Sequence, residues 1–185
     1  LEYNSNDYYS NLGLKTNYNI ILKNLNSVGK DSSKYKSSPQ IELVSLFNAE
    51  FSLPLIKISE KYTNLLTPKL SASFNPSDMK DYSDSNNRIN INNIFTPNRL
   101  GLSDTFESGR SLTLGLDYNK TKNNDLNEIN DYFQFKLATV LRDKNEEFIP
   151  KKSSLNDKHS NIFGSLHGQF NQKFNLEYNF SIDND

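Results

Sequence analysis

Residues that could act as a nucleophile are scarce in this chain of 185 residues. Ser103 lies in the stretch GLSDT, residues 101–105, which resembles a nucleophile elbow because a glycine stands two residues before the serine. An elbow also needs a second glycine two residues after the serine and a strand that leads directly into it. Thr105 stands in place of that glycine, and no predicted strand precedes Ser103. We therefore do not expect Ser103 to be a nucleophile.

The chain has two histidines, and the sequence places neither beside a residue with which it could transfer a proton. His159 falls in a charged loop, and His167 falls on the polar side of a predicted strand. A general base must lie within hydrogen-bond reach of the proton that it removes. We predict no catalytic residue, and we expect that the protein is not an enzyme.

The acidic stretch DYSDSNN offers Asp81, Asp84 and Asn86 as oxygen ligands for calcium. A calcium loop also needs a glycine for its sharp turn and a glutamate that binds through both oxygens, and the spacing here supplies neither. The chain has no cysteine, which excludes a thiolate metal site and a disulfide framework. We predict no metal and no cofactor, and interpret this stretch as a solvated loop.

The most unusual group of polar residues is the stretch NIFTPNRLGLSDTFESGR, residues 93–110, which is followed by the strand-like sequence SLTLGLDY. It combines charges of both signs with Pro97 and the glycines Gly101 and Gly109. Whether it is a catalytic loop, a ligand loop or a folded cover depends on the strands that hold it.

Seven segments of the chain alternate with a period of two residues, as strands with two different faces do. They cover residues 12–22, 41–55, 66–74, 112–118, 133–141, 162–170 and 174–182. One side of each segment is apolar and free of charge, and several of these sides run over about 9–15 residues, the length of transmembrane strands. The charges lie on the opposite side, at Lys15, Glu42, Glu50, Lys69, Asp117, Lys136 and Glu177.

Long polar connections alternate with shorter ones along the chain, as in an outer-membrane barrel. The long loops lie near residues 24–40, 75–110 and 143–161. The fold class that we predict is all-β: an antiparallel up-and-down meander that forms an arc of a large transmembrane outer-membrane β-barrel. Residues 1–185 are expected to be one partial barrel domain of about seven strands, because bacterial barrels close with even strand numbers.

Composition restricts the class of protein further. The net charge is −1 and the basic residues are dispersed, so no nucleic-acid partner is expected. No stretch approaches the roughly 20 apolar residues of a membrane helix. The chain begins at Leu1 without methionine, and we expect it to be a piece of a longer protein.

Two other classes of protein stay open, the wall of a general porin or receptor barrel and a soluble β-sandwich binding module.

The loop motif carries a resemblance to a known family. The stretch NIFTPNRLGLSDTFESGRSLTLGLDY resembles the barrel segment of the lipopolysaccharide-assembly outer-membrane protein family, LptD. Two flanking pieces, LLTPKLSASFNP and DKHSNIFGSLHGQFNQKFNLEYNFSID, are similar to that family in order and kind, so the resemblance covers roughly residues 65–183. The matching loop residues are Asn93, Phe95, Asn98, Arg99, Gly101, Asp104, Glu107 and Gly109. One departure is Ser108, where the family often has a second glycine.

The resemblance implies a function and a set of partners. It implies part of a translocon that inserts lipopolysaccharide into the outer leaflet of the bacterial outer membrane. The implied partners are lipopolysaccharide, outer-membrane lipid, a plug lipoprotein and a periplasmic bridge that delivers lipopolysaccharide. We expect residues 93–110 to fold back over or into the lumen, with Arg99 and Arg110 paired to Asp104, to Glu107 or to carboxylates of the lumen. The alternative is that Arg99 contacts a lipopolysaccharide phosphate, which its planar fork would suit.

Overall fold

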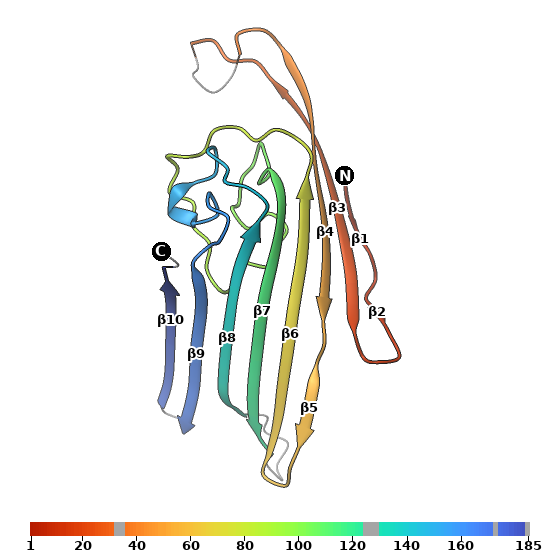
Figure 1. Ribbon diagram of the computed structural model, residues 1–185, viewed down its shortest axis with the longest axis vertical. Helices are drawn as coiled ribbons and strands as arrows, with labels where there is room; N and C mark the ends of the chain where they lie inside the picture. The colour runs from red at the N-terminus through yellow and green to blue at the C-terminus, as the bar shows by residue number, and fades with distance from the viewer. Residues whose placement is uncertain (32–35, 124–129, 172–173, 184–185) are drawn as a thin grey trace.

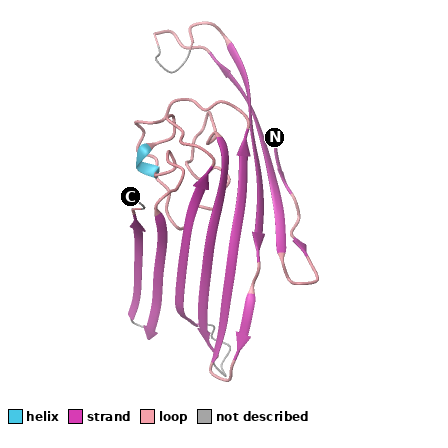
Figure 2. Ribbon diagram, viewed as in Figure 1, coloured by secondary structure: helices cyan, strands magenta, loops and turns pink. Residues whose placement is uncertain are grey.

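The computed structural model describes residues 1–31, 36–123, 130–171 and 174–183, and it combines one antiparallel sheet with long irregular loops (Figure 1). Its only helical element in these residues is a short 3-10 turn, as Figure 2 shows. The elements are β1 (Glu2–Asn4), β2 (Tyr8–Tyr9), β3 (Lys15–Ser27), β4 (Gln40–Ser52), β5 (Leu55–Ile58), β6 (Tyr62–Asn75), β7 (Gly109–Lys122), β8 (Asn130–Arg142), η1 (Lys151–Ser153), β9 (Ile162–Asn171) and β10 (Phe174–Ile182).

Strands that follow one another in the chain also lie side by side in the sheet. The order is β1-β3-β4-β6-β7-β8-β9-β10, and the short strands β2 and β5 pair with β3 and β6. All of these pairs are antiparallel. The prediction of an all-β antiparallel meander is therefore confirmed, and the described sheet is an open arc rather than a closed barrel.

The seven predicted segments correspond to β3, β4 and β6 to β10, and one of them is divided. The segment predicted over residues 41–55 ends as β4 at Ser52 and resumes as β5 at Leu55. Pro54 has no N–H to donate at this point. Pro68, in the neighbouring β6, accepts a bond from the N–H of Leu53 at 3.1 Å but likewise cannot donate one back. In register, Pro68 lies opposite Leu53 and Pro54 lies opposite Thr67, so two residues without an N–H group stand next to each other where the ladder is interrupted.

The connections alternate between the two ends of the sheet (Figure 1). The loops that include residues 28–39, 76–108 and 143–161 extend from one end, drawn at the top. The β5–β6 turn at residues 59–61 lies at the other end. The short connection between the predicted segments 162–170 and 174–182 falls in part outside the described residues. The observed alternation agrees with the predicted asymmetry of long loops and short turns.

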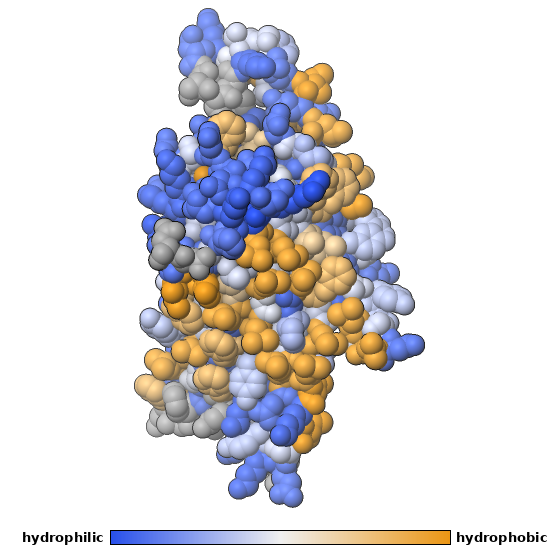
Figure 3. All heavy atoms as spheres, viewed as in Figure 1, coloured by the Kyte–Doolittle hydropathy of each residue, from blue (hydrophilic) through white to orange (hydrophobic). Residues whose placement is uncertain are grey.

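In a water-soluble sheet the apolar side is buried and the polar side is exposed. In this sheet the polar side is buried and the apolar side is exposed. The polar side lies under the loops, so that Ser71 is 2% exposed and Thr113 is 1% exposed. The apolar side faces outward, where Leu114 is 38% exposed and Phe47 is 40% exposed. Figure 3 shows an apolar belt across the strands, between a hydrophilic end formed by loops and a hydrophilic end formed by turns.

The apolar residues of the long loops form the core beneath the polar side of the sheet. Met79, Ile94 and Leu102 of the 76–108 loop pack with Val140 of β8 and with Ile149 of the 143–161 loop. A second cluster joins Phe106 of the first loop to Val44 and Leu46 of β4. The loops therefore cover the inner side of the sheet from β4 across to β9, where Phe163 joins the first cluster.

On the outer side, Phe180 of β10 stands over its cross-strand partner Gly164 of β9. A Cβ atom at residue 164 would overlap the ring. We expect Gly164→Ala to destabilise the sheet by about 1–3 kcal/mol, the usual cost of overpacking. Urea unfolding of the protein in lipid vesicles measures this loss. If the clash is the cause, Phe180→Leu will remove most of the penalty in the double variant, and additive effects would show that the ring is not involved.

Candidate functional site

The candidate site is the place where the 76–108 loop returns to the sheet and enters β7. Arg99 lies at its centre and is 6% exposed. Its Nε donates to Oε2 of Glu107 at 2.7 Å, and its Nη2 donates to Oε1 of Glu107 and to Oγ of Ser111. Its Nη1 donates to Oγ1 of Thr113 at 2.9 Å and to the carbonyl oxygen of Ile94 at 3.5 Å. All five N–H donors of the guanidinium therefore have acceptors within the protein.

A second arginine approaches the same carboxylate from the end of β8. Nη1 of Arg142 donates to Oε1 of Glu107, and Nη2 donates to the carbonyl oxygen of Ser108. Arg142 is 7% exposed, so the carboxylate and both guanidinium groups are largely withdrawn from water. Removing charges from water is costly, and their mutual attraction offsets this cost only where the geometry and hydrogen bonds are complete. Arg99, Glu107 and Arg142 form a triad that links the loop to the beginning of β7 and the end of β8.

The electrostatics of the triad hold Glu107 in its ionised form. Burial by itself raises the pKa of the Glu107 carboxyl group, because it disfavours a charge. The charge and hydrogen bonds of Arg99, together with the charge of Arg142, outweigh burial and leave the pKa below its ordinary value. The carboxylate is therefore a permanent anion near neutral pH, bridging two permanent cations.

A tight turn carries Arg99 to this position. The side-chain amide of Asn98 donates to the carbonyl oxygen of Leu102 at 2.9 Å and accepts from the N–H of Leu102 at 3.2 Å. The N–H of Gly101 donates to the carbonyl oxygen of Asn98 at 2.9 Å, and Gly101 has φ +65°. A residue with a Cβ atom rarely adopts this φ, so a glycine fits the turn.

Gly109 occupies the junction at which the loop becomes β7. Its φ is +78°, and a Cβ atom there would lie 3.3 Å from Oε1 of Glu146 and 3.5 Å from Nη2 of Arg142. Both the backbone conformation and the close approach of Arg142 therefore favour a residue without a side chain.

Asp104 belongs to a different set of contacts. It accepts a hydrogen bond from the hydroxyl group of Tyr82, and its Oδ2 lies 3.7 Å from Nζ of Lys80. Lys80 also lies 3.4 Å from Oε2 of Glu42 in β4. These contacts tie the descending and returning halves of the loop to each other and to the sheet.

Asn93 and Phe95 lie at the innermost part of the loop. Asn93 Oδ1 accepts from the N–H of Asn90 at 2.7 Å, which closes a turn. The ring of Phe95 lies directly on Gly115 of β7, where a Cβ atom would overlap it, and Nζ of Lys69 lies 5.6 Å from the ring centroid. The glycine leaves a recess in the sheet that the ring fills.

The structure thus gives each of the eight motif residues a place in the loop, but it does not gather them into one cluster. Arg99, Glu107 and Gly109 meet at the junction with β7, whereas Asn98 and Gly101 form the turn before it. Arg110, for which a carboxylate partner was also considered, lies over the ring of Phe74 at 5.5 Å on the outer side of the sheet.

Sequence reasoning did not identify the partners that the sheet supplies to the motif. Ser111 and Thr113 bind Arg99, Gly115 receives Phe95, and Arg142 binds Glu107. The sequence did contain a signal for Ser111, Thr113 and Gly115. These residues alternate along the non-apolar side of the strand that directly follows the motif. No pattern in the sequence connects Arg142 with Glu107, 35 positions away.

The residues considered for catalysis and metal binding lie apart from the triad. His159 and Ser103 are exposed, and His167 is partly buried on the inner side of β9. Asp81 accepts bonds from the hydroxyl and N–H groups of Ser83, which lower the pKa of its carboxyl group. Over the described ranges, no group of three or more histidine and acidic residues is placed to hold a metal ion. In the same ranges, no helix has the length and apolar character needed to cross a membrane.

The triad generates a prediction about stability. In Glu107→Gln, an amide replaces the carboxylate between two buried guanidinium groups, which leaves both charges uncompensated. We expect a loss of about 3–5 kcal/mol in the free energy of unfolding, measured with urea in lipid vesicles. The matched control is Asp7→Asn, which breaks the solvent-accessible pair of Asp7 with Lys15 and should cost far less, because ion pairs in contact with water contribute little to stability. Equal losses in the two variants would contradict a central role for the triad.

The depressed pKa of Glu107 generates a prediction about pH. A carboxyl group whose pKa is lower in the folded state stabilises the fold fully above its unfolded pKa, about 4.3, and loses this effect as the pH falls through the folded value. We expect amide hydrogen exchange in residues 98–108, corrected for intrinsic rates, to rise as the pH decreases below about 4. Glu107→Gln should lack this dependence. The same acid response in the variant and the wild type would assign it to another group.

Of the three comparisons with known proteins, one gave a match. The comparison with curated protein sequences gave no match, and the comparison with solved structures gave none. The family model described as LptD, LPS transport system D, matches residues 2–185. The match extends beyond the motif to both ends of the sheet, including β1 to β5. The chain belongs to the LptD family of lipopolysaccharide transport proteins.

Proposed function

We propose that residues 1–185 form part of the wall of one outer-membrane barrel domain, in a translocon that inserts lipopolysaccharide into the outer leaflet. The observation that carries this proposal is the reversed burial of the sheet. Large apolar side chains face outward over the length of long strands, and polar side chains face inward. An outer side without charges along the middle of its strands fits a lipid environment. An Arg or Lys at the middle of the bilayer would cost about 2–4 kcal/mol.

The 76–108 loop acts in this proposal as a folded inner cover of the barrel wall. Its apolar residues pack against the inner side of the sheet, and the triad fastens its returning end. A structural role for Arg99 is favoured over contact with a lipopolysaccharide phosphate, since all five of its donors are already engaged. The other motif residues shape the turns that allow this cover to fit.

The translocon would require partners that supply and guide its cargo. A periplasmic bridge would deliver lipopolysaccharide, and a plug lipoprotein would occupy the lumen. The polar inner surface near the turns, away from the loop cover, is the part of this arc that would face such a lumen. Asp117, Lys136 and Asn119 lie on that surface by register, with Lys69 paired to Asp117 at 2.5 Å.

The test uses cells in which the full-length protein is depleted and then supplied again from a plasmid. We expect depletion to stop newly made lipopolysaccharide from reaching the cell surface, while the uptake of small sugars through the outer membrane stays unchanged. Surface labelling of lipopolysaccharide and a sugar-uptake assay measure the two quantities. Reduced sugar uptake with normal lipopolysaccharide export would instead identify a general porin.

Two matched substitutions test the orientation of the wall. Leu114→Arg places a charge on the outer side and should prevent stable insertion and restoration of export. Thr67→Arg places the same charge on the inner side, opposite Asp117 in register, and should restore export to near the wild-type level. If Thr67→Arg is the more harmful of the two, the proposed orientation is wrong.

A further inference from the structure

The outer side of the sheet is not evenly filled, because it contains a groove that crosses β3, β4, β6 and β7. Its volume is 620 Å³. The floor is formed by Ala49 and Ala72, which are cross-strand partners in β4 and β6. Two small residues at paired positions leave a hollow between the larger side chains on either side.

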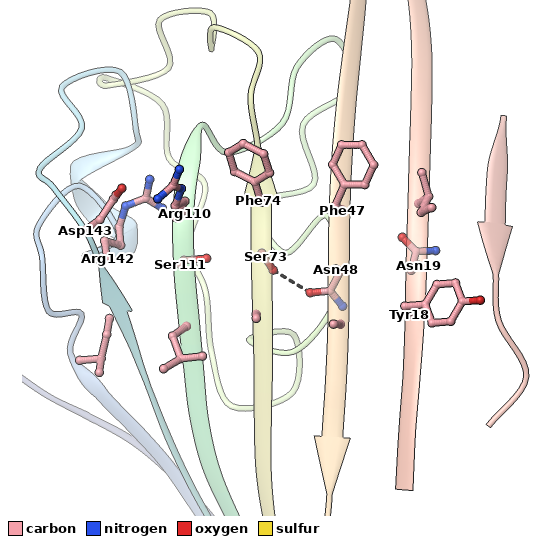
Figure 4. A pocket seen from close by; sticks show the side chains of 15 residues that line it. Tyr18, Asn19, Phe47, Asn48, Ser73, Phe74, Arg110, Ser111, Arg142 and Asp143 are labelled. Carbon is pink, nitrogen blue, oxygen red and sulfur yellow. Dashed lines mark hydrogen bonds between the residues drawn. The ribbon is translucent and has the colours of Figure 1, made fainter. Parts of the chain in front are cut away.

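Large apolar side chains form the walls of the groove. Phe47 and Phe74 lie side by side above the floor, with ring centroids 6.3 Å apart (Figure 4). Tyr18 and Ile20 of β3 border one side. The opposite side is bordered by Leu112 of β7 and Leu141 of β8. An empty hollow of this size would forfeit dispersion contacts along its whole lining, so an apolar chain that fills it is stabilised.

One exposed cation, Arg110, lies at the end of the groove that is nearest the long loops. Arg110 is exposed, is the register partner of Phe74, and places its guanidinium 5.5 Å from the centroid of that ring. Figure 4 shows Arg110, Arg142 and Asp143 at this end, which therefore carries both signs of charge, and the guanidinium of Arg142 is engaged with Glu107 and Ser108. An anion would therefore be held by direct contact with Arg110 rather than by a broadly positive surface. The guanidinium fork matches the geometry of a phosphate.

We propose that this groove is a binding site for one phosphate-bearing membrane lipid. One acyl chain lies over Ala49 and Ala72, between the aromatic rings and Leu112, and the head-group phosphate contacts Arg110. The order of the groove fits the order of a lipid, because its cation lies at the loop end and its apolar floor lies further along the strands. The inference rests on the proposed membrane-facing orientation of the apolar side.

The experiment places the full-length protein in nanodiscs that contain phosphatidylglycerol or, separately, diacylglycerol with the same acyl chains in a phosphatidylcholine background. The protein is then released from the nanodisc, and native mass spectrometry measures how much of each lipid stays bound to it. Arg110→Gln should lower phosphatidylglycerol retention about tenfold or more, since a charged hydrogen bond is lost, and leave diacylglycerol retention unchanged. Arg110→Lys should restore part of it. Ala72→Phe fills the groove and should lower the retention of both lipids.

Two control variants change the same surface properties elsewhere. Leu176→Phe enlarges an exposed apolar side chain on β10, and Arg88→Gln removes an exposed cation from the loops. Both should retain lipid as the wild type does. Unchanged retention in Arg110→Gln and in Ala72→Phe, with normal insertion, would overturn the lipid site alone. Failure of the wild-type protein to insert into the nanodisc would instead overturn the proposed function.

Discussion

A carboxylate bridged by two buried arginines is the interaction on which the inner architecture depends. Glu107 joins Arg99 of the loop to Arg142 of β8, while Ser111 and Thr113 of β7 and the carbonyl oxygen of Ile94 accept the remaining bonds of Arg99. Each partner lies on a different part of the chain, so the loop, β7 and β8 can satisfy the charges only in one arrangement. A buried charge left without its partner costs far more than an exposed one, which makes this arrangement specific as well as stable.

The triad allows a polar sheet surface to be buried. A barrel wall in lipid turns its polar side inward, and that side must meet water, a partner or another part of the chain. Here the 76–108 loop covers much of it, bringing Ile94 and Leu102 against Val140 while Arg99 and Asn98 satisfy polar groups. The cover thus combines apolar packing with hydrogen bonds to buried polar groups, as a surface of mixed character requires.

Small residues determine where large ones can lie on both sides of the sheet. Gly115 receives the ring of Phe95 on the inner side, and Gly164 receives Phe180 on the outer side. The outer groove arises from the same principle, except that no side chain of the described residues fills the hollow above Ala49 and Ala72. A recess that is filled by a side chain of the same protein stabilises the fold, whereas the open groove above Ala49 and Ala72 has room for a bound lipid chain.

The sequence alone determined the seven longer strands and their two faces, because a period of two residues dictates which side chains share a side of a sheet, but it did not predict the short strands β1 and β2. It also offered Glu107 as one of several possible carboxylate partners of Arg99, because both residues belong to the same charged loop. Only the tertiary structure decided that Arg142 completes the triad, and that Pro54 and Pro68 lie in neighbouring pairs of the ladder where β4 ends and β5 begins. These features depend on residues brought together by strand register, and local periodicity carries no information about which distant positions become neighbours.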